Sequence, residues 1–148
     1  MSEGPTRLDA IVRHLRQLGH RISPQRLAIL RVLAESPDHP TAEAVHQQLL
    51  AEFPDMSLAT VYKTIAVLKN CGEILELQFS DRDNRYDAKL PSPHPHCICL
   101  RCGAIADPPA TGLEDLTRAL ATASGYAITA HRLDFYGLCP ACQARQKK

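Results

Sequence analysis

The stretch "SLATVYKTIAVLKNCG", residues 57–72, decides how the first half of the chain folds. Its first residue, Ser57, is a preferred helix N-cap, and its last, Gly72, is a residue type that ends helices. Between them, apolar residues recur at steps of three and four, as on the buried face of a helix, at Leu58, Val61, Ile65 and Leu68. The stretch therefore predicts one capped, amphipathic helix.

Three helices are expected before this one. The first runs from Leu8 to Leu18, the second opens at Ser23-Pro24, and the third is capped by Thr41 and extends to Phe53. After residue 72, "EILELQFSDRDNRYDA" alternates apolar and polar residues around a polar turn, which indicates a β-hairpin. Helices followed by a hairpin are typical of a winged helix-turn-helix.

The proline-dense segment "LPSPHP", residues 90–95, predicts a hinge. Beyond it, "HCICL", "AIAD" and "YAITAHRLDFYG" are expected strands, and Thr111 with Glu114 predicts a capping box for a helix ended by Gly125. We therefore expect an α+β protein. Its predicted parts are a winged-helix domain at 1–89, the hinge at 90–95 and a small α+β domain at 96–148.

Two C-x-x-C pairs bracket the small domain. Cys99 with Cys102 and Cys139 with Cys142 offer four thiolates, the ligand set of a tetrahedral structural zinc site. A domain below 60 residues needs such a staple, and the alternative is a redox dithiol. The two other cysteines, Cys71 and Cys97, are interpreted as small structural residues, with a metal or redox role for Cys97 as the minority view.

A second group of candidate metal ligands lies in the same stretch of sequence as the first cysteine pair. His94 and His96 are two apart and are expected to project to one face of a strand, with Asp107 on the next strand. Nitrogen and oxygen ligands without thiolate favour iron(II) or manganese(II). Taken alone the pair is a weak signal, because surface histidines beside prolines usually bind nothing.

Charge and hydropathy narrow the classes of protein. The net charge is +1, yet six arginines lie between Arg7 and Arg31, whereas the acids up to that point are Glu3 and Asp9, so a nucleic-acid footprint is a candidate there. No apolar run approaches the roughly 18 residues of a membrane span, and "MSEGPTRLDA" lacks a signal-peptide core. These features predict a cytoplasmic protein.

Several motifs occur together with a characteristic order and spacing: "RISPQRLAIL", "HPTAEAVHQQL", "SLATVYKTIAVL", "RYDA", "CICLRCG" and "HRLDFYGLCPAC". In these the chain resembles the ferric uptake regulator family, and most closely its peroxide-stress repressor subfamily. The resemblance implies a dimeric, metal-dependent transcriptional repressor that binds palindromic operator DNA. It also implies a structural zinc on the four knuckle cysteines and a regulatory iron(II) or manganese(II) ion on His39, Asp87, His94, His96 and Asp107.

The subfamily depends mainly on position 107. Peroxide sensors resemble this chain in carrying aspartate there, whereas iron-uptake regulators usually carry glutamate. The resemblance then implies that His39 or His94 is oxidised by peroxide. Alternatives are an iron-uptake regulator or a nickel, manganese or zinc sensor. Glu114 and His131 match an additional metal site of the family, although each has another expected role.

The helix at 57–72 is expected to enter the major groove, with the residues Ala59, Tyr62, Lys63 and Thr64 facing DNA. Arg16, Arg21 and Arg26 are expected to contact the backbone, and Arg82 and Arg85 to approach the minor groove from the wing. The hypothesis from another class is a metal-dependent or thiol redox enzyme. It would need an open coordination position beside a general base, and the sequence offers no further acid or nucleophile for that role.

Overall fold

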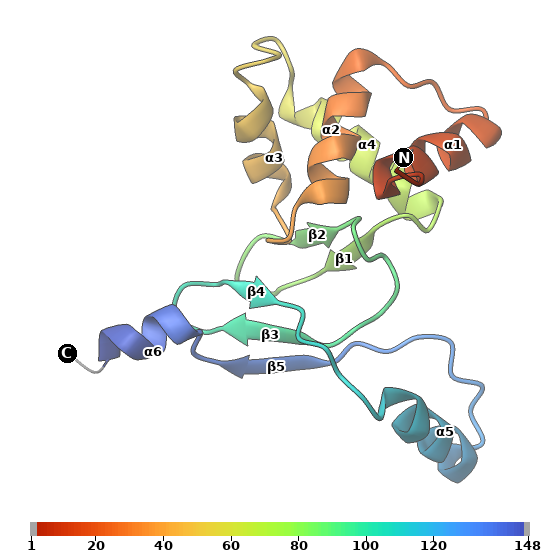
Figure 1. The fold of residues 1–148 in the computed structure, drawn as a ribbon, viewed down its shortest axis with the longest axis vertical. Helices are drawn as coiled ribbons and strands as arrows, with labels where there is room; N and C mark the ends of the chain where they lie inside the picture. The colour runs from red at the N-terminus through yellow and green to blue at the C-terminus, as the bar shows by residue number, and fades with distance from the viewer. Residues whose placement is uncertain (1–2, 147–148) are drawn as a thin grey trace. The chain divides into compact units, whose positions relative to one another are not determined.

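The computed structural model describes residues 3–146, which form two compact units divided between Ser92 and Pro93 (Figure 1). The first unit is mainly helical and ends in a hairpin, whereas the second combines a small sheet with two helices. The α+β class expected from the sequence is confirmed. Within residues 3–146, no helix is both long and apolar enough to cross a bilayer.

Capped helices make up most of the first unit. They are α1 (Arg7–Gln17), α2 (Pro24–Glu35), α3 (Ala42–Leu49) and α4 (Leu58–Asn70). Each follows a serine or threonine whose side chain accepts a hydrogen bond from a backbone N–H of the first turn. The caps expected at Ser23, Thr41 and Ser57 are confirmed. Thr6 adds a capping box with Asp9 that the sequence reasoning missed.

The apolar stripes of these helices meet in one core. Its fully buried members include Ile11, Leu15, Ile29, Leu30, Leu33, Val45, Val61 and Leu68. The expected extension of α3 to Phe53 is wrong. The N–H groups of Glu52 and Phe53 both bond to the carbonyl of Leu49, at 3.2 and 2.8 Å, so the chain turns there. Phe53 still packs against the core, which explains why the apolar period continued past the end of the helix.

The predicted hairpin is present. Strand β1 (Leu75–Leu77) pairs antiparallel with β2 (Arg85–Asp87), and Glu76 lies opposite Tyr86. Ile74 and Tyr86 are buried in the helical core, so the hairpin is packed onto the helices of its own unit. Helices followed by a packed hairpin give the first unit a winged-helix architecture.

The second unit is built on a three-stranded sheet in the order β4-β3-β5. Its strands are β3 (His96–Cys99), β4 (Ile105–Ala106) and β5 (Asp134–Gly137), and its helices are α5 (Leu113–Ser124) and α6 (Pro140–Gln146). Strands β3 and β4 are antiparallel and joined by a tight turn, whereas β3 and β5 are parallel. A parallel pair needs a long crossover, and the segment containing α5 supplies it.

Several expectations for this unit are wrong in detail. Helix α5 begins after Gly112, whose φ of 85° is the left-handed conformation that glycine adopts without strain, and no side chain caps it. The capping box of Thr111 and Glu114 is therefore absent. The final strand covers only residues 134–137, and α6 was not predicted at all. The end of α5 at Gly125, with φ 74°, is as expected.

Candidate metal centres

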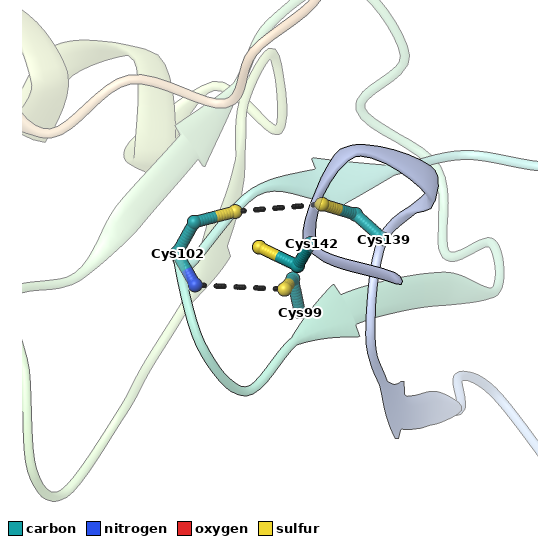
Figure 2. Close-up of side chains that lie close together, drawn as sticks. All are labelled: Cys99, Cys102, Cys139 and Cys142. Atoms are coloured by element: carbon teal, nitrogen blue, oxygen red, sulfur yellow. Dashed lines mark hydrogen bonds between the residues drawn. The ribbon is translucent and has the colours of Figure 1, made fainter. Parts of the chain in front are cut away.

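The four knuckle cysteines converge on one point of the second unit (Figure 2). Cys99 ends β3 and Cys102 lies in the turn that follows, whereas Cys139 directly precedes α6 and Cys142 lies in its first turn. All four sulfur atoms lie within 4.8 Å of one another, and Cys102 Sγ is 3.6 Å from Cys139 Sγ. This spacing fits four ligands around one tetrahedral ion.

The pKa values of the cysteine thiols in this cluster also favour a bound cation. The backbone N–H of Cys102 points at Cys99 Sγ over 3.5 Å, and this hydrogen bond is the largest cause of a Cys99 pKa of about 5. The neighbouring sulfurs, Cys139 first among them, raise the pKa of Cys142 to about 12. Sulfurs this close repel one another when they are thiolates, and a divalent cation would neutralise that charge. The donor set fits zinc, which prefers a closed thiolate site.

The two remaining cysteines lie elsewhere. Cys71 is the C-cap of α4, is half-buried against the core, and its sulfur is 4.0 Å from His20 Nε2. Cys97 is exposed between the buried residues His96 and Ile98, which confirms that it points to the opposite face of its strand. None of the six cysteines forms a disulfide.

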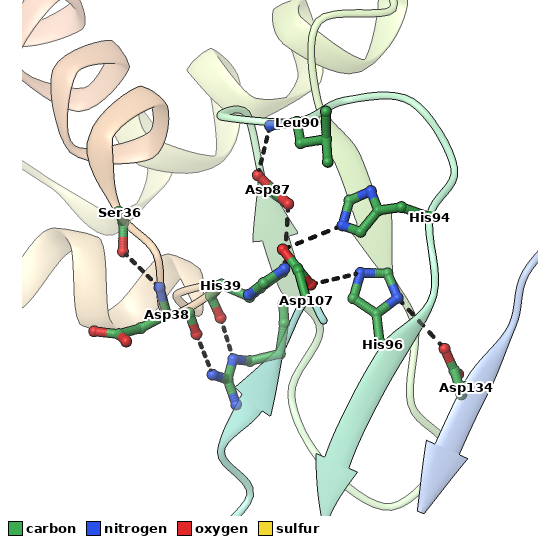
Figure 3. Close-up of polar contacts among 10 residues, drawn as sticks. Ser36, Asp38, His39, Asp87, Leu90, His94, His96, Asp107 and Asp134 are labelled. Carbon is green, nitrogen blue, oxygen red and sulfur yellow. Dashed lines mark hydrogen bonds and ion pairs between the residues drawn. The ribbon is translucent and has the colours of Figure 1, made fainter. Parts of the chain in front are cut away.

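Two histidines of the second unit face one carboxylate (Figure 3). His94 Nε2 lies 3.3 Å from Asp107 Oδ2, and His96 Nε2 lies 3.5 Å from Asp107 Oδ1. The ring centroids are 4.4 Å apart, so both imidazoles lie on the same side of the chain, as expected. His94 precedes β3, however, and Asp107 follows β4, so both lie just outside the observed strands, whereas the sequence had placed them on strands.

Asp134 is a neighbour of His96 that the sequence reasoning missed. His96 lies opposite Asp134 in the parallel β3–β5 pair, and His96 Nδ1 is 3.6 Å from Asp134 Oδ1. Arg132 Nε donates to the other oxygen of this carboxylate at 2.9 Å. A carboxylate behind a ligating imidazole fixes the ring's orientation. Only the parallel register brings these residues together, and no local pattern reveals it.

A second histidine–carboxylate pair lies in the first unit. His39 Nε2 is 3.2 Å from Asp87 Oδ2, and the two residues are 2% and 3% exposed. The N–H of Leu90 donates to the other Asp87 oxygen at 2.9 Å (Figure 3). His39 has a φ of 51°, which is uncommon for a residue with a side chain. Each unit thus contributes nitrogen and oxygen groups of the kind that bind iron(II) or manganese(II).

Glu114 and His131 line one hollow of about 760 Å³ beside α5. Within residues 3–146, neither belongs to a group of three or more histidine, cysteine or acidic residues with donor atoms within 4.8 Å of one another.

Of the α4 residues expected to contact DNA, some are exposed and one is buried. Ala59, Tyr62 and Lys63 are exposed on α4, and Tyr62 Oη donates to Glu43 Oε1 of α3 at 2.8 Å. Thr64 is 1% exposed, and its hydroxyl donates to the carbonyl of Thr60 at 3.1 Å. The expectation that Thr64 faces DNA is therefore wrong, because it continues the buried stripe of the helix.

The arginines expected to contact DNA also differ in how exposed they are and in the partners of their side chains. Arg16 and Arg21 are exposed, whereas Arg26 is half-buried and its Nη1 donates to the carbonyl of Arg21 at 2.9 Å. Arg82 stays at the hairpin turn. Arg85, expected at the minor groove, is turned away from that role because its guanidinium donates to the carbonyls of Asp38 and His39.

A helical unit with a packed hairpin, a four-thiolate knuckle and two histidine–carboxylate groups define the chain as a metal-binding winged-helix protein. A family model described as the ferric uptake regulator family matches residues 17–136. The chain belongs to this family, as its motifs predicted, and the family comprises metal-responsive transcriptional regulators.

Named relatives agree with this assignment. The peroxide-responsive repressor PerR of Staphylococcus aureus is 40% identical over 136 residues, covering 92% of this chain and 91% of that protein. The solved structure of a zinc-bound manganese uptake regulator has a TM-score of 0.70 at 29% identity, covering 87% of this chain and 98% of that one. The structure of PerR from Streptococcus pyogenes has a TM-score of 0.54 at 34% identity, with coverages of 93% and 94%.

Proposed function

We propose that this protein is a cytoplasmic, dimeric repressor whose binding to a palindromic operator depends on a regulatory metal and is lost on exposure to peroxide. The observation that carries the proposal is that Asp107 faces two imidazoles, His94 and His96, in a chain whose other unit is a winged helix. The working domain division is 1–89, 90–95 and 96–148.

Two metals have separate roles in this proposal. Zinc on Cys99, Cys102, Cys139 and Cys142 staples the second unit and stays bound. Iron(II) or manganese(II) is held by the residues His39, Asp87, His94, His96 and Asp107. Because these five come from both units, one ion bound by all of them would restrict the units to one arrangement. By linkage, operator DNA must then tighten metal binding by the factor by which metal tightens DNA binding.

The proposed DNA surface is the exposed side of α4. Tyr62 supplies an aromatic ring for thymine methyl groups, Lys63 a cation for phosphate or guanine, and Ala59 a small residue that permits close approach. Arg16, Arg21 and Arg26 would contact the phosphate backbone. Thr64 has no part in this surface, since its side chain is buried.

The proposed dimer uses the second unit. No residue of α5 is buried, and Leu116 and Leu120 on one face are 51% and 53% exposed. Phe135 and Tyr136 of β5 are 54% and 59% exposed. Exposed apolar groups concentrated on one small unit favour an interface between copies. A two-fold dimer would place two reading helices symmetrically, which requires a palindromic operator.

Peroxide sensing rests on Asp107 and on the similarity to peroxide-responsive repressors. In the proposed reaction, hydrogen peroxide transfers one oxygen atom to a ring carbon of His39 or His94 and leaves as water. The two electrons that reduce the peroxide come from the imidazole ring, and a bound iron(II) would serve to activate the O–O bond without net oxidation. The oxidised imidazole is a poorer ligand, so metal and then DNA are released. The second candidate is an iron-uptake regulator, which the same ligands permit and which predicts indifference to peroxide.

The experiment starts from the full chain loaded with zinc only. Duplex DNA is selected from a random pool with and without manganese(II), and the affinity for the selected operator is measured by fluorescence anisotropy. We expect a palindrome to be selected, and only when manganese is present. His94→Ala should retain zinc but lose the metal response. Equal DNA affinity with and without manganese or iron(II) would refute a regulatory metal.

A further inference from the structure

Arg85 is bound to the segment that carries His39. Its Nε donates to the carbonyl of His39, and its Nη2 donates to the carbonyl of Asp38 at 2.5 Å. Both contacts lie within the first unit, where β2 runs beside the segment that joins α2 to α3. A planar guanidinium presents several donors in a fixed fork, so it fixes two successive carbonyl groups at once.

The backbone that Arg85 contacts is strained. His39 has a φ of 51°, and the proline that follows it, Pro40, further restricts which conformations are open to it. Such a conformation is unfavourable by itself and persists only when its surroundings hold it. Arg85 donates hydrogen bonds to the carbonyl groups of Asp38 and His39, which flank the strained φ, and thereby holds that conformation.

The same strand also supplies a third hydrogen bond to this segment, and the carboxylate that faces His39. The N–H of Tyr86 donates to the carbonyl of Pro40 at 3.0 Å, and Asp87 is the next residue. Three successive residues of β2 therefore engage three successive residues of the segment. As a result the His39 Nε2 atom lies 3.2 Å from Asp87 Oδ2 (Figure 3).

We propose that Arg85 is a positioning residue of the regulatory metal site, holding His39 and Asp87 as a preformed pair of ligands. The inference rests on the proposed function, because it deepens the role of that site. Arg85 touches neither DNA nor metal in this role and acts through the backbone of His39. Without the fork, the segment is free to relax to an ordinary φ, and its imidazole moves away from the carboxylate.

The test compares Arg85→Ala and Arg85→Lys with Arg82→Ala in the full-length, zinc-loaded protein. Arg82 is a matched control, since it lies in the same hairpin, pairs with Asp81 at 3.5 Å and lies over the Phe79 ring. Manganese(II) affinity is measured by competition with a fluorescent chelator. Thermal unfolding and operator affinity at saturating manganese are measured on the same variants. Loss of a residue that orients a metal ligand typically costs 10- to 100-fold in affinity.

We expect Arg85→Ala to weaken manganese binding at least 10-fold while operator affinity at saturating manganese stays within about twofold. Arg82→Ala should keep the wild-type manganese affinity. Arg85→Lys keeps the charge but lacks the fork, so it should resemble the alanine variant. If the alanine variant does not fold, the lysine variant decides alone. Wild-type manganese affinity in Arg85→Lys would overturn the proposal.

Two further results separate this inference from the proposed function. Unchanged manganese affinity in Arg85→Ala, with weaker operator binding at saturating metal, would make Arg85 a DNA contact and overturn the positioning role alone. In that case His94→Ala would still abolish manganese binding. A wild-type chain that binds no manganese beyond its zinc would instead refute the proposed function itself.

Discussion

Cys102 Sγ lies 3.6 Å from Cys139 Sγ although the two residues are 37 positions apart. The contact joins the turn after β3 to the turn before α6, so the whole crossover containing α5 lies between its ends. A single ion on the four sulfurs would close that loop and supply folding free energy that a small core lacks.

Loss of one of these ligands should therefore unfold the second unit. We expect Cys99→Ser or Cys142→Ser to release one zinc per chain and to dissociate the dimer, because zinc binding and folding are coupled. Elemental analysis and light scattering after gel filtration measure both. Cys97→Ser is the matched control, since Cys97 points to the opposite face of β3, and it should retain zinc and dimer. A stable, zinc-free dimer of Cys99→Ser would contradict the structural role.

Substitutions on α4 should separate base reading from phosphate contact. Tyr62→Ala is expected to weaken specific operator binding by about 1–3 kcal/mol, and Lys63→Ala to lower the salt slope by about one. Lys69→Ala is the control, because Lys69 pairs with Glu76 at 2.9 Å and lies at the far end of the helix. Anisotropy titrations at several salt concentrations measure both quantities. If Tyr62→Ala and Lys63→Ala bind operator normally, another element reads the DNA.

Glu73 should make stability depend on pH. It pairs with Arg7 Nη2 and His14 Nδ1, each at 2.6 Å. Burial raises its pKa, but the hydrogen bonds to His14 and then Arg7 outweigh burial, so the net pKa is below the usual 4.5. A depressed folded-state pKa stabilises the fold above the unfolded-state value, and the contribution is lost as pH falls through the folded-state value.

Glu73→Gln should therefore reduce the free energy of unfolding by about 1 kcal/mol at pH 7. The difference from wild type should shrink as the pH falls below about 4.5, the region where an unfolded glutamate takes up its proton. Urea unfolding over a pH series measures this difference, and the exposed Glu35→Gln serves as control. A Glu73→Gln deficit that stays constant down to pH 3 would show that the ion pairs are not its source.

Peroxide should distinguish the two regulator subclasses. We expect the iron-loaded protein to lose operator binding at low peroxide, with one oxygen atom added to His39 or His94, while the manganese-loaded protein remains active. Peptide mass spectrometry locates the oxygen. Asp107→Glu should keep metal-dependent DNA binding but respond less to peroxide, because the longer side chain places the carboxylate differently against the imidazoles.

The thiols provide the control for that experiment. Inactivation that follows disulfide formation at Cys97 or the knuckles, and is reversed by thiol reductants, would assign sensing to cysteine chemistry. An iron-loaded protein that is indifferent to peroxide would favour the iron-uptake alternative.

Local patterns determined much of this protein. Caps at Ser23, Thr41 and Ser57, the helical period of α4 and the β1–β2 hairpin depend on interactions between residues close in sequence, so the sequence alone predicts them. The two C-x-x-C pairs are equally local, and their thiolate chemistry already indicates zinc. The motifs also indicated the family that the comparisons confirm.

Tertiary structure decided what depends on residues distant in sequence. Thr64 is buried because the face of α4 that packs against the core is wider than its row of apolar residues. The spacing of apolar residues therefore shows only roughly which side chains are covered. The parallel register of β3 and β5 places Asp134 behind His96, and the packing of β2 places Arg85 on the carbonyl of His39. Side-chain chemistry can be read from a sequence, but the partner of each side chain is set by long-range packing, which no local period encodes.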